Sequence, residues 1–153
     1  MSPSKQPASH SAAPTPVDSA LYQEIQHFYA RQMRFLDQAM VEEWAQTFTD
    51  DGVFTANAHP EPSVGCAAIA GGARKAAEQL AEQGIQRRHW LGMLEADEHP
   101  DGTVHARTYA LILSTPRGGQ AAVHLSTTCD DVLVREEGGL RVRRREVRRD
   151  DLR

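Results

Sequence analysis

Four strand-like runs follow Gly84, and they constrain the fold more than any other feature of the sequence. Glycine-containing turns separate these runs, and runs joined this directly pair as antiparallel neighbours. The C-terminal half of the chain is therefore expected to form an antiparallel sheet. The four predicted strands span residues 86–96, 103–115, 120–136 and 140–148.

The N-terminal half shows the apolar spacing of helices instead. From Leu21 to Leu36 apolar residues recur every three or four positions, which predicts a long amphipathic helix with Asp18 or Ser19 as its N-cap. A shorter helix places Met40, Trp44 and Phe48 on one face. A third helix is expected over residues 66–83, where Gly84 supplies the residue that ends it.

The segment between the second and third helices reads as a turn at residues 49–52, a short strand at 53–56 and a loop at 57–65. Helices followed by an antiparallel meander indicate an α+β domain. One face of a long curved sheet needs cover, and the three helices supply it. Together they are expected to form a cone that encloses a pocket.

The first 18 residues are rich in Ser, Pro and Ala without hydrophobic periodicity, and we expect a disordered tail there. This leaves one domain over residues 19–153. The net charge of −4 does not suggest a nucleic-acid partner. No apolar run approaches the ~20 residues of a membrane span, and no secretory signal is recognisable. We expect a cytoplasmic protein whose two cysteines are reduced.

The histidines and cysteines show no metal-ligand spacing, so no metal site is expected. No GxGxxG, GxSxG or P-loop motif is present, and we expect no cofactor. Several arginines cluster within residues 141–149, with acidic residues nearby and no aromatic residues for stacking. This pattern favours an ion-paired strand end over a nucleic-acid site.

Four stretches carry a family resemblance: residues 35–37, 44–54, 65–69 and 88–92. On these the chain resembles the NTF2-like superfamily, and in particular its SnoaL-like branch, over about residues 20–152. The resemblance implies a cone in which three N-terminal helices pack on a curved, mainly antiparallel sheet. Residues 28–33, 57–62 and 123–129 further resemble small cyclase/dehydratase proteins of bacterial aromatic polyketide pathways, including those associated with pyran-ring formation.

His89 is the residue with the clearest capacity for chemistry, because a histidine can move protons near neutral pH. Scytalone dehydratases, of the same superfamily, carry a catalytic histidine in a His-aromatic-aliphatic-Gly string, which is similar to residues 89–92. Their orienting aspartate falls on Asp37. The resemblance implies a His89–Asp37 dyad, while their second catalytic histidine has no match at residues 114–116. A structural role for both residues is the alternative.

Strand and helix periodicity sort the neighbours of this dyad. Tyr29, Met33 and Asp37 form one stripe of the first helix. On the strand at 86–96, alternation puts Leu91 and Met93 on the face of His89. Trp90 then lies on the outer face, which suggests a homodimer through the open side of the sheet.

Further residues are expected around a small, hydrophobic aromatic substrate, although ordinary core packing is the alternative for the aromatic ones. The resemblance implies that Thr127 and Cys129 point inward and that His124 lies on the outer face. One arginine, Arg144 or Arg145, is expected to turn inward toward a substrate carboxylate or carbonyl. The predicted substrate-binding residues are Tyr29, Met33, Trp44, Phe54, Tyr109, Thr127, Cys129 and Arg145.

The function predicted from the resemblance is cofactor-independent cyclisation or dehydration of an aromatic polyketide intermediate, with His89 and Asp37 as acid–base catalysts. One alternative is a non-catalytic ligand-binding or accessory subunit that resembles the β subunit of ring-hydroxylating dioxygenases. In such a subunit we expect side chains to close the pocket. Another is an isomerase or epoxide hydrolase on the same fold, which requires a further carboxylate in the pocket. Nucleic acids and membranes are not expected as partners.

Overall fold

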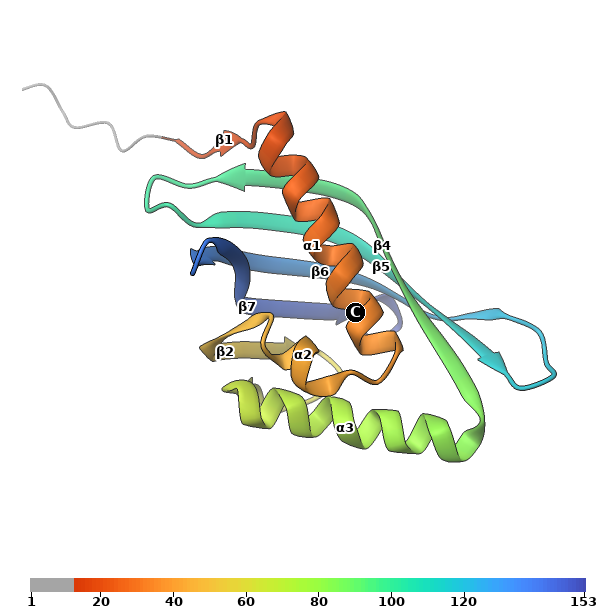
Figure 1. Cartoon of the computed structure of the whole chain (residues 1–153). Helices are drawn as coiled ribbons and strands as arrows, with labels where there is room; N and C mark the ends of the chain where they lie inside the picture. The colour runs from red at the N-terminus through yellow and green to blue at the C-terminus, as the bar shows by residue number, and fades with distance from the viewer. Residues whose placement is uncertain (1–12) are drawn as a thin grey trace, which may run out of the picture.

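The computed structural model describes residues 13–153 and contains three helices beside a seven-stranded sheet (Figure 1). The helices are α1 (Ser19–Asp37), α2 (Val41–Ala45) and α3 (Cys66–Gln83), and a short 3-10 helix, η1 (Asp150–Leu152), follows the last strand. The strands are β1 (Thr15–Pro16), β2 (Phe48–Ala56), β3 (Ser63–Val64), β4 (Ile85–Glu98), β5 (Val104–Pro116), β6 (Ala122–Glu136) and β7 (Gly139–Arg149).

The strands follow the order β1-β4-β5-β6-β7-β2-β3, and every neighbouring pair is antiparallel except β2 with β7. Figure 1 shows α1 running diagonally across one face of the twisted sheet, with α2 and α3 below it toward β2. The predicted α+β architecture of helices on a curved, mainly antiparallel sheet is confirmed. Among the described helices, none is long and apolar enough to cross a membrane.

The two long helices begin and end where the sequence predicts. The Asp18 carboxylate caps α1 by accepting the Leu21 N–H at 2.8 Å. Gly84 ends α3 with a left-handed backbone (φ 65°), a conformation that glycine adopts without strain. The buried stripe of α1 faces the sheet, and it consists of Ile25, Tyr29, Gln32 and Met33.

The segment at 48–52 differs from its prediction. Phe48 begins β2 instead of ending α2, and the predicted turn lies inside the strand. Phe48 pairs with Val142 and Val53 with Arg144, so the intervening residues form an irregularity that does not end the strand. The Phe48 ring is fully buried. The free energy gained by burying it outweighs the preference of residues 49–52 for a turn.

A bulge in β4 overturns the predicted position of Met93. The register with β5 shifts between Gly92 and Glu95, and Met93 takes a left-handed backbone (φ 54°). One extra residue reverses the alternation of all that follow it. Met93 is therefore 78% exposed, whereas Leu94 is buried. Trp90, before the bulge, is exposed, as its predicted outward direction requires.

The segment expected to be a tail is described only from residue 13 onward. Residues 1–12 of that prediction lie outside the described residues. Thr15 and Pro16 form β1, which pairs with Glu98 and Asp97 at the edge of β4. Ordered backbone thus begins before the predicted boundary at residue 18, because the edge of β4 offers hydrogen-bonding partners to this short segment.

The irregularity in β2 yields a stability prediction. A Cβ added at Gly52 would lie 3.0 Å from the Thr49 carbonyl oxygen and 3.1 Å from the Phe48 Cβ. We expect Gly52→Ala to lower the free energy of unfolding by about 1–3 kcal/mol, because neither neighbour can move without disturbing the core. Urea denaturation measures the change.

Gly71→Ala is the matched control, since nothing lies within 4 Å of the added methyl group on the helix α3. This substitution should raise the free energy of unfolding by about 0.5–1 kcal/mol. Equal effects of the two substitutions would contradict the crowding argument.

Candidate active site

A cavity of about 300 Å³ lies between the helices and the concave face of the sheet. Its wall is mostly apolar, and it contains few polar groups, which is typical of small-molecule sites. A second hollow, of about 400 Å³, lies between α1, α2 and the β6–β7 turn, where exposed acidic and basic side chains surround it. The residues that line the first cavity include Met33, Leu36, Trp44, Phe54, His59, Ile69, His89, Leu91, Ala110, Ile112, Thr127, Cys129, Arg145 and Val147.

Asp37 and His89 meet at this cavity. His89 Nδ1 lies 2.6 Å from Asp37 Oδ1, and the His89 backbone N–H donates to Asp37 Oδ2 at 3.1 Å. The Asp37 side chain is 7% exposed and that of His89 is 20% exposed. Gln86 Nε2 also donates to the Asp37 carbonyl oxygen, which fastens the end of α1 to the start of β4.

This geometry determines which ring nitrogen is available. A carboxylate beside Nδ1 favours the tautomer that carries its proton there, an assignment that follows from the hydrogen-bond network. Nε2 is then the atom left to accept a proton, while the imidazole itself lines the cavity. The dyad expected from the resemblance is thus assembled in space, and its catalytic role stays a prediction.

A buried ion pair forms the second polar feature of the site. Arg145 Nε donates to Asp131 Oδ1 at 2.9 Å, and Nη2 donates to Oδ2 at 2.8 Å. Arg145 Nη2 also donates to Gln32 Oε1 at 2.7 Å, and the Tyr29 hydroxyl donates to Asp131 Oδ2 at 2.7 Å. Both charges are buried, and their hydrogen bonds compensate for the water they have lost.

Burial changes the acidity of the groups in this cluster. It raises the pKa of Tyr29 well above its ordinary value, and the negative charge of Asp131 adds to that rise. For Arg145, burial alone would lower the pKa, but the Asp131 carboxylate raises it above its ordinary value. Burial likewise raises the pKa of the Cys129 thiol to about 12. Cys129 is therefore a neutral thiol on the cavity wall at neutral pH, with little nucleophilic character.

Two predicted substrate-binding residues lie elsewhere. Tyr109 is 61% exposed on the outer face of the sheet, because its neighbour Ala110 takes the inward position on β5. The prediction for Tyr109 is wrong. Tyr29 is buried behind the cavity with its hydroxyl on Asp131, so it supports the wall without lining it. The predicted residues that line the cavity are Met33, Trp44, Phe54, Thr127, Cys129 and Arg145.

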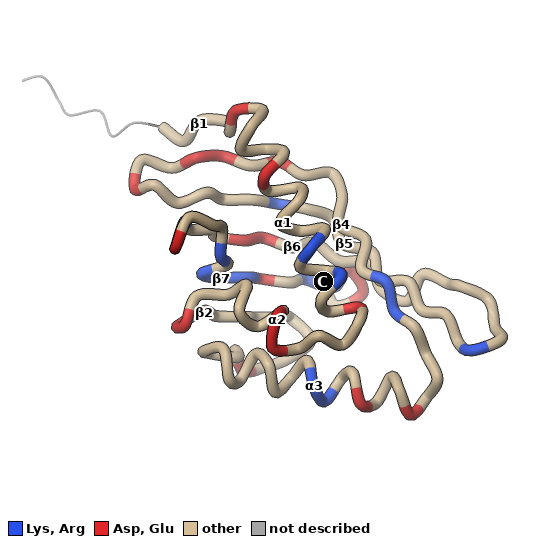
Figure 2. Tube along the Cα trace, in the orientation of Figure 1, with Lys and Arg blue, Asp and Glu red and all other residues tan. Residues whose placement is uncertain are grey.

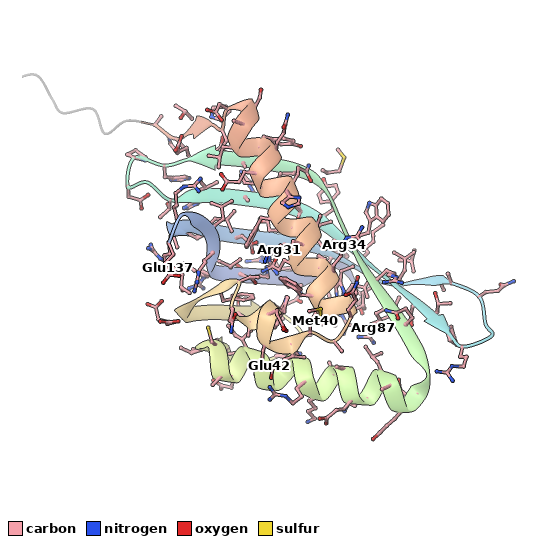
Figure 3. All side chains as sticks on the ribbon, viewed as in Figure 1. Arg31, Arg34, Met40, Glu42, Arg87 and Glu137 are labelled. Atoms are coloured by element: carbon pink, nitrogen blue, oxygen red, sulfur yellow. The ribbon has the colours of Figure 1, made fainter. Side chains whose placement is uncertain are left out.

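His124, predicted to lie on the outer face, is exposed and does not line the cavity. The β5–β6 register shifts so that Ile112 pairs with Leu125 but Leu113 with Val123, which leaves His124 as the extra residue. Its Nε2 lies 3.2 Å from Nη2 of Arg87. Arg87 extends from β4 near the C-terminal end of α1 (Figure 3) and alternates in phase with His89.

The basic run on β7 behaves largely as predicted. Figure 2 shows positive charge along much of β7. Arg148 pairs with Glu146 and Arg149 with Asp151 near the end of the strand. Arg145 is the exception, since it turns inward, as expected for Arg144 or Arg145, and takes Asp131 as its partner.

Sequence reasoning missed two titratable residues of the site, Asp131 and His59, together with several apolar residues that line the cavity. Asp131 has a recognisable signal, because it continues the inward alternation of Thr127 and Cys129 and lies directly opposite Arg145 in the register of β6 and β7. His59 has none, because it lies in the loop after β2, and only the folded chain brings it to the cavity wall. Over residues 13–153, no cluster of three or more His, Cys, Asp or Glu side chains is arranged to hold a metal ion.

The ion pair gives a prediction for stability. Arg145→Met leaves the Asp131 carboxylate buried without a countercharge, and the free energy of unfolding should fall by about 3–5 kcal/mol. Asp131→Asn introduced in addition removes the uncompensated charge and should restore part of that loss. Urea denaturation of the two single variants and the double variant measures the coupling.

Arg148→Met is the control for this cycle. It removes an exposed arginine from its pair with Glu146 and should change the free energy of unfolding by no more than about 1 kcal/mol. Additive effects of Arg145→Met and Asp131→Asn would mean that the two side chains do not act as a pair.

Comparison with known proteins places this site in a family context. The chain matches the SnoaL-like domain over residues 18–146. It is 38% identical to Aln2 from a Streptomyces species, with a TM-score of 0.83, covering 89% of this chain and 95% of Aln2. The comparison with curated proteins gives no match.

Two other solved structures share most of the chain. A protein from Catenulispora acidiphila, solved in complex with S-DNPA, is 40% identical with a TM-score of 0.76, covering 88% of this chain and 96% of that one. ActVI-ORFA from Streptomyces coelicolor is 31% identical with a TM-score of 0.81, covering 87% and 99%. These similarities confirm the NTF2-like cone and the resemblance to proteins of polyketide biosynthesis.

Proposed function

Because the chain belongs to the SnoaL-like domain family, we propose that it is a cofactor-independent cyclase or dehydratase acting on an aromatic polyketide intermediate. The observation that carries the proposal is the contact between His89 and Asp37 at the wall of an open, mostly apolar cavity. A family match alone does not specify an activity, since one fold hosts many functions. The site supplies the chemical argument.

In the proposed mechanism His89 Nε2 acts as the general base. It takes a proton from a carbon next to a carbonyl group, or from a hydroxyl that attacks to close a ring. The carboxylate of Asp37 holds the ring and stabilises the imidazolium that forms. The same nitrogen then returns the proton to the departing hydroxyl, which leaves as water in a dehydration. His59, also on the cavity wall, is a second imidazole within the site.

The cavity supports the proposed substrate class. A volume of about 300 Å³ is at the small end of ligand sites and suits a compact aromatic molecule of two or three rings. Trp44 and Phe54 present aromatic surface to it. The complex of the Catenulispora acidiphila protein with S-DNPA supports a small-molecule ligand in this family.

The rival functions have less support. An accessory subunit is expected to have a pocket closed by side chains, whereas this cavity is open and contains an acid–base pair. An isomerase or epoxide hydrolase requires a further carboxylate facing the substrate. The carboxylate of Asp131 is buried, and Arg145 and Tyr29 already occupy it.

We also propose that a second copy of the chain covers the outer face of the sheet. Large apolar side chains are exposed there, which is unusual for a surface in contact with water only. They come from neighbouring strands, so they form a continuous area. The exposed residues of this outer patch are Trp90, Met93, Tyr109, Leu111 and Val123.

His89→Ala tests the proposed base. We expect kcat to fall by about 10²–10⁴-fold, since the substitution removes the group that accepts the proton. Asp37→Asn should also lower kcat, because the ring loses the carboxylate that holds it. Product formation from a panel of two- and three-ring aromatic hydroxyketones, followed by liquid chromatography, measures both.

His124→Ala provides the control for a histidine outside the cavity lining, and it should keep near-normal turnover. Circular dichroism establishes that each variant is folded. Full activity in folded His89→Ala protein would exclude the proposed mechanism.

Trp90→Glu tests the second copy. A charge at the centre of the outer patch should convert a dimer to monomers, as measured by sedimentation velocity at micromolar concentration. Lys75→Glu on α3 changes an exposed side chain on another surface and should leave the dimer intact. A wild-type protein that sediments as a monomer would refute this assembly.

A further inference from the structure

Two exposed residues stand out among those that line the cavity. The other lining residues are buried or half-buried, whereas His59 and Gly72 are exposed to solvent. His59 lies in the loop between β2 and β3, and Gly72 lies on α3. A residue that both lines a cavity and is exposed marks the place where the cavity opens. His59 and Gly72 therefore define the mouth of the cavity.

Gly72 borders this mouth from the flank of α3. It follows Ile69, the one buried residue of α3, by three positions, so the two lie beside each other on the helix surface. Gly71 is turned by about 100° around the helix axis from Gly72, and it does not line the cavity. The two glycines thus share one helix but differ in their surroundings, because only Gly72 borders the cavity.

The fold itself does not require a glycine at position 72. A Cβ added there would meet no heavy atom within 4 Å, and the backbone of Gly72 has no positive φ. Inside a helix, glycine is less stable than alanine, because it loses more conformational freedom on folding. What Gly72 supplies is space, since the α3 side of the mouth stays free of a side chain.

Contacts on both sides of Gly72 hold this part of α3 in place. Ile69 packs in the hydrophobic core, and Arg74 pairs with Glu42 of α2. The helix backbone at Gly72 therefore sets the edge of the mouth, and no side chain has to move aside to open it. A ligand that fits wholly inside a cavity needs an opening only while it enters. A ligand that extends out of the cavity needs the opening throughout.

We propose that Gly72 makes the cavity selective for aromatic substrates with a flexible chain. The rings lie in the cavity, and the chain leaves through the mouth between α3 and the β2–β3 loop. A cavity of about 300 Å³ suits two or three rings and leaves no room for a long substituent as well. A side chain at position 72 would obstruct the exit of that chain. The proposal rests on the proposed function for its aromatic substrate class, and binding tests it independently of turnover.

The first experiment compares 2-naphthol with its ether of diethylene glycol, two probes that share the naphthalene rings and differ in a flexible chain. Isothermal titration calorimetry measures the affinity of each for the wild type, Gly72→Leu and Gly71→Leu. The wild type should bind both probes. Gly72→Leu should bind the ether at least about tenfold more weakly and keep its affinity for 2-naphthol, because the leucine obstructs the mouth without filling the cavity. Gly71→Leu should change neither affinity.

Three results would overturn the proposal. The first is an unchanged affinity of Gly72→Leu for the ether. The second is an equal loss of affinity for both probes, because the leucine would then fill the cavity. The third is a wild type that does not bind the ether. Both leucine variants should unfold at a higher urea concentration than the wild type, since leucine favours a helix over glycine and its Cβ meets no neighbour. Weaker binding then cannot come from unfolding.

A second experiment tests whether His59 and Gly72 border the same opening. His59→Ala, added to Gly72→Leu, widens the mouth from the loop side and should restore part of the lost affinity for the ether. His124→Ala removes a histidine that does not line the cavity, and it should restore none. If His59→Ala restores no more than His124→Ala, the two residues do not share one mouth and the proposal is wrong.

His89→Ala separates this proposal from the proposed function. In this background Gly72→Leu should still weaken binding of the ether alone, because the base lies on β4 and the glycine on α3. Loss of turnover in His89→Ala together with this retained effect supports both proposals. Normal turnover with the retained effect rejects the base and keeps the mouth. Loss of turnover without any effect of Gly72→Leu rejects the mouth and keeps the base.

Discussion

The buried pair of Arg145 and Asp131 is the interaction on which the rest of the structure depends. Removing two charges from water costs several kcal/mol per ion unless they are well paired and hydrogen-bonded. That requirement brings Tyr29 and Gln32 of α1 onto the pair, and Gln32 in turn donates to Thr47 beside β2. One compensated charge pair thus connects the first helix to the centre of the sheet and to the segment that carries Trp44.

The same connection sets the position of the acid–base pair. Gln32 and Asp37 lie on one helix, little more than a turn apart. The hydrogen bond from Arg145 to Gln32 fixes the position of α1, and this position determines where Asp37, the last residue of the helix, meets β4. Gln86 secures that meeting point from the strand. The contact between Asp37 and His89 therefore depends on the buried ion pair as well as on its own hydrogen bonds.

The inward direction of His89, Thr127 and Cys129 was expected from the family resemblance. Periodicity predicts the helices, the order of the four long strands and the neighbours that share a face with these residues, because these follow from local spacing. It fails where a ladder holds an extra residue. Met93 and His124 both lie at such irregularities, and for Met93 alternation read across the bulge assigns the wrong face. Asp131 and His59 were not predicted. The role of Asp131 depends on its cross-strand register with Arg145, and that of His59 on the path of a loop, and neither follows from local sequence. The contact of Asp37 with His89 was accessible only through family resemblance, since nothing local links residues so far apart.

The bulge at Met93 divides β4 into two segments whose inward residues have different surroundings. Before it, inward residues face the ligand cavity, and after it, Leu94 and Ala96 belong to the core near the start of α1. The bulge shifts the alternation of side chains by one residue. The inward positions of the two segments therefore do not follow one continuous series along the strand. A strand built this way separates the residues that line the cavity from the residues that pack in the core, although both sets lie on one strand.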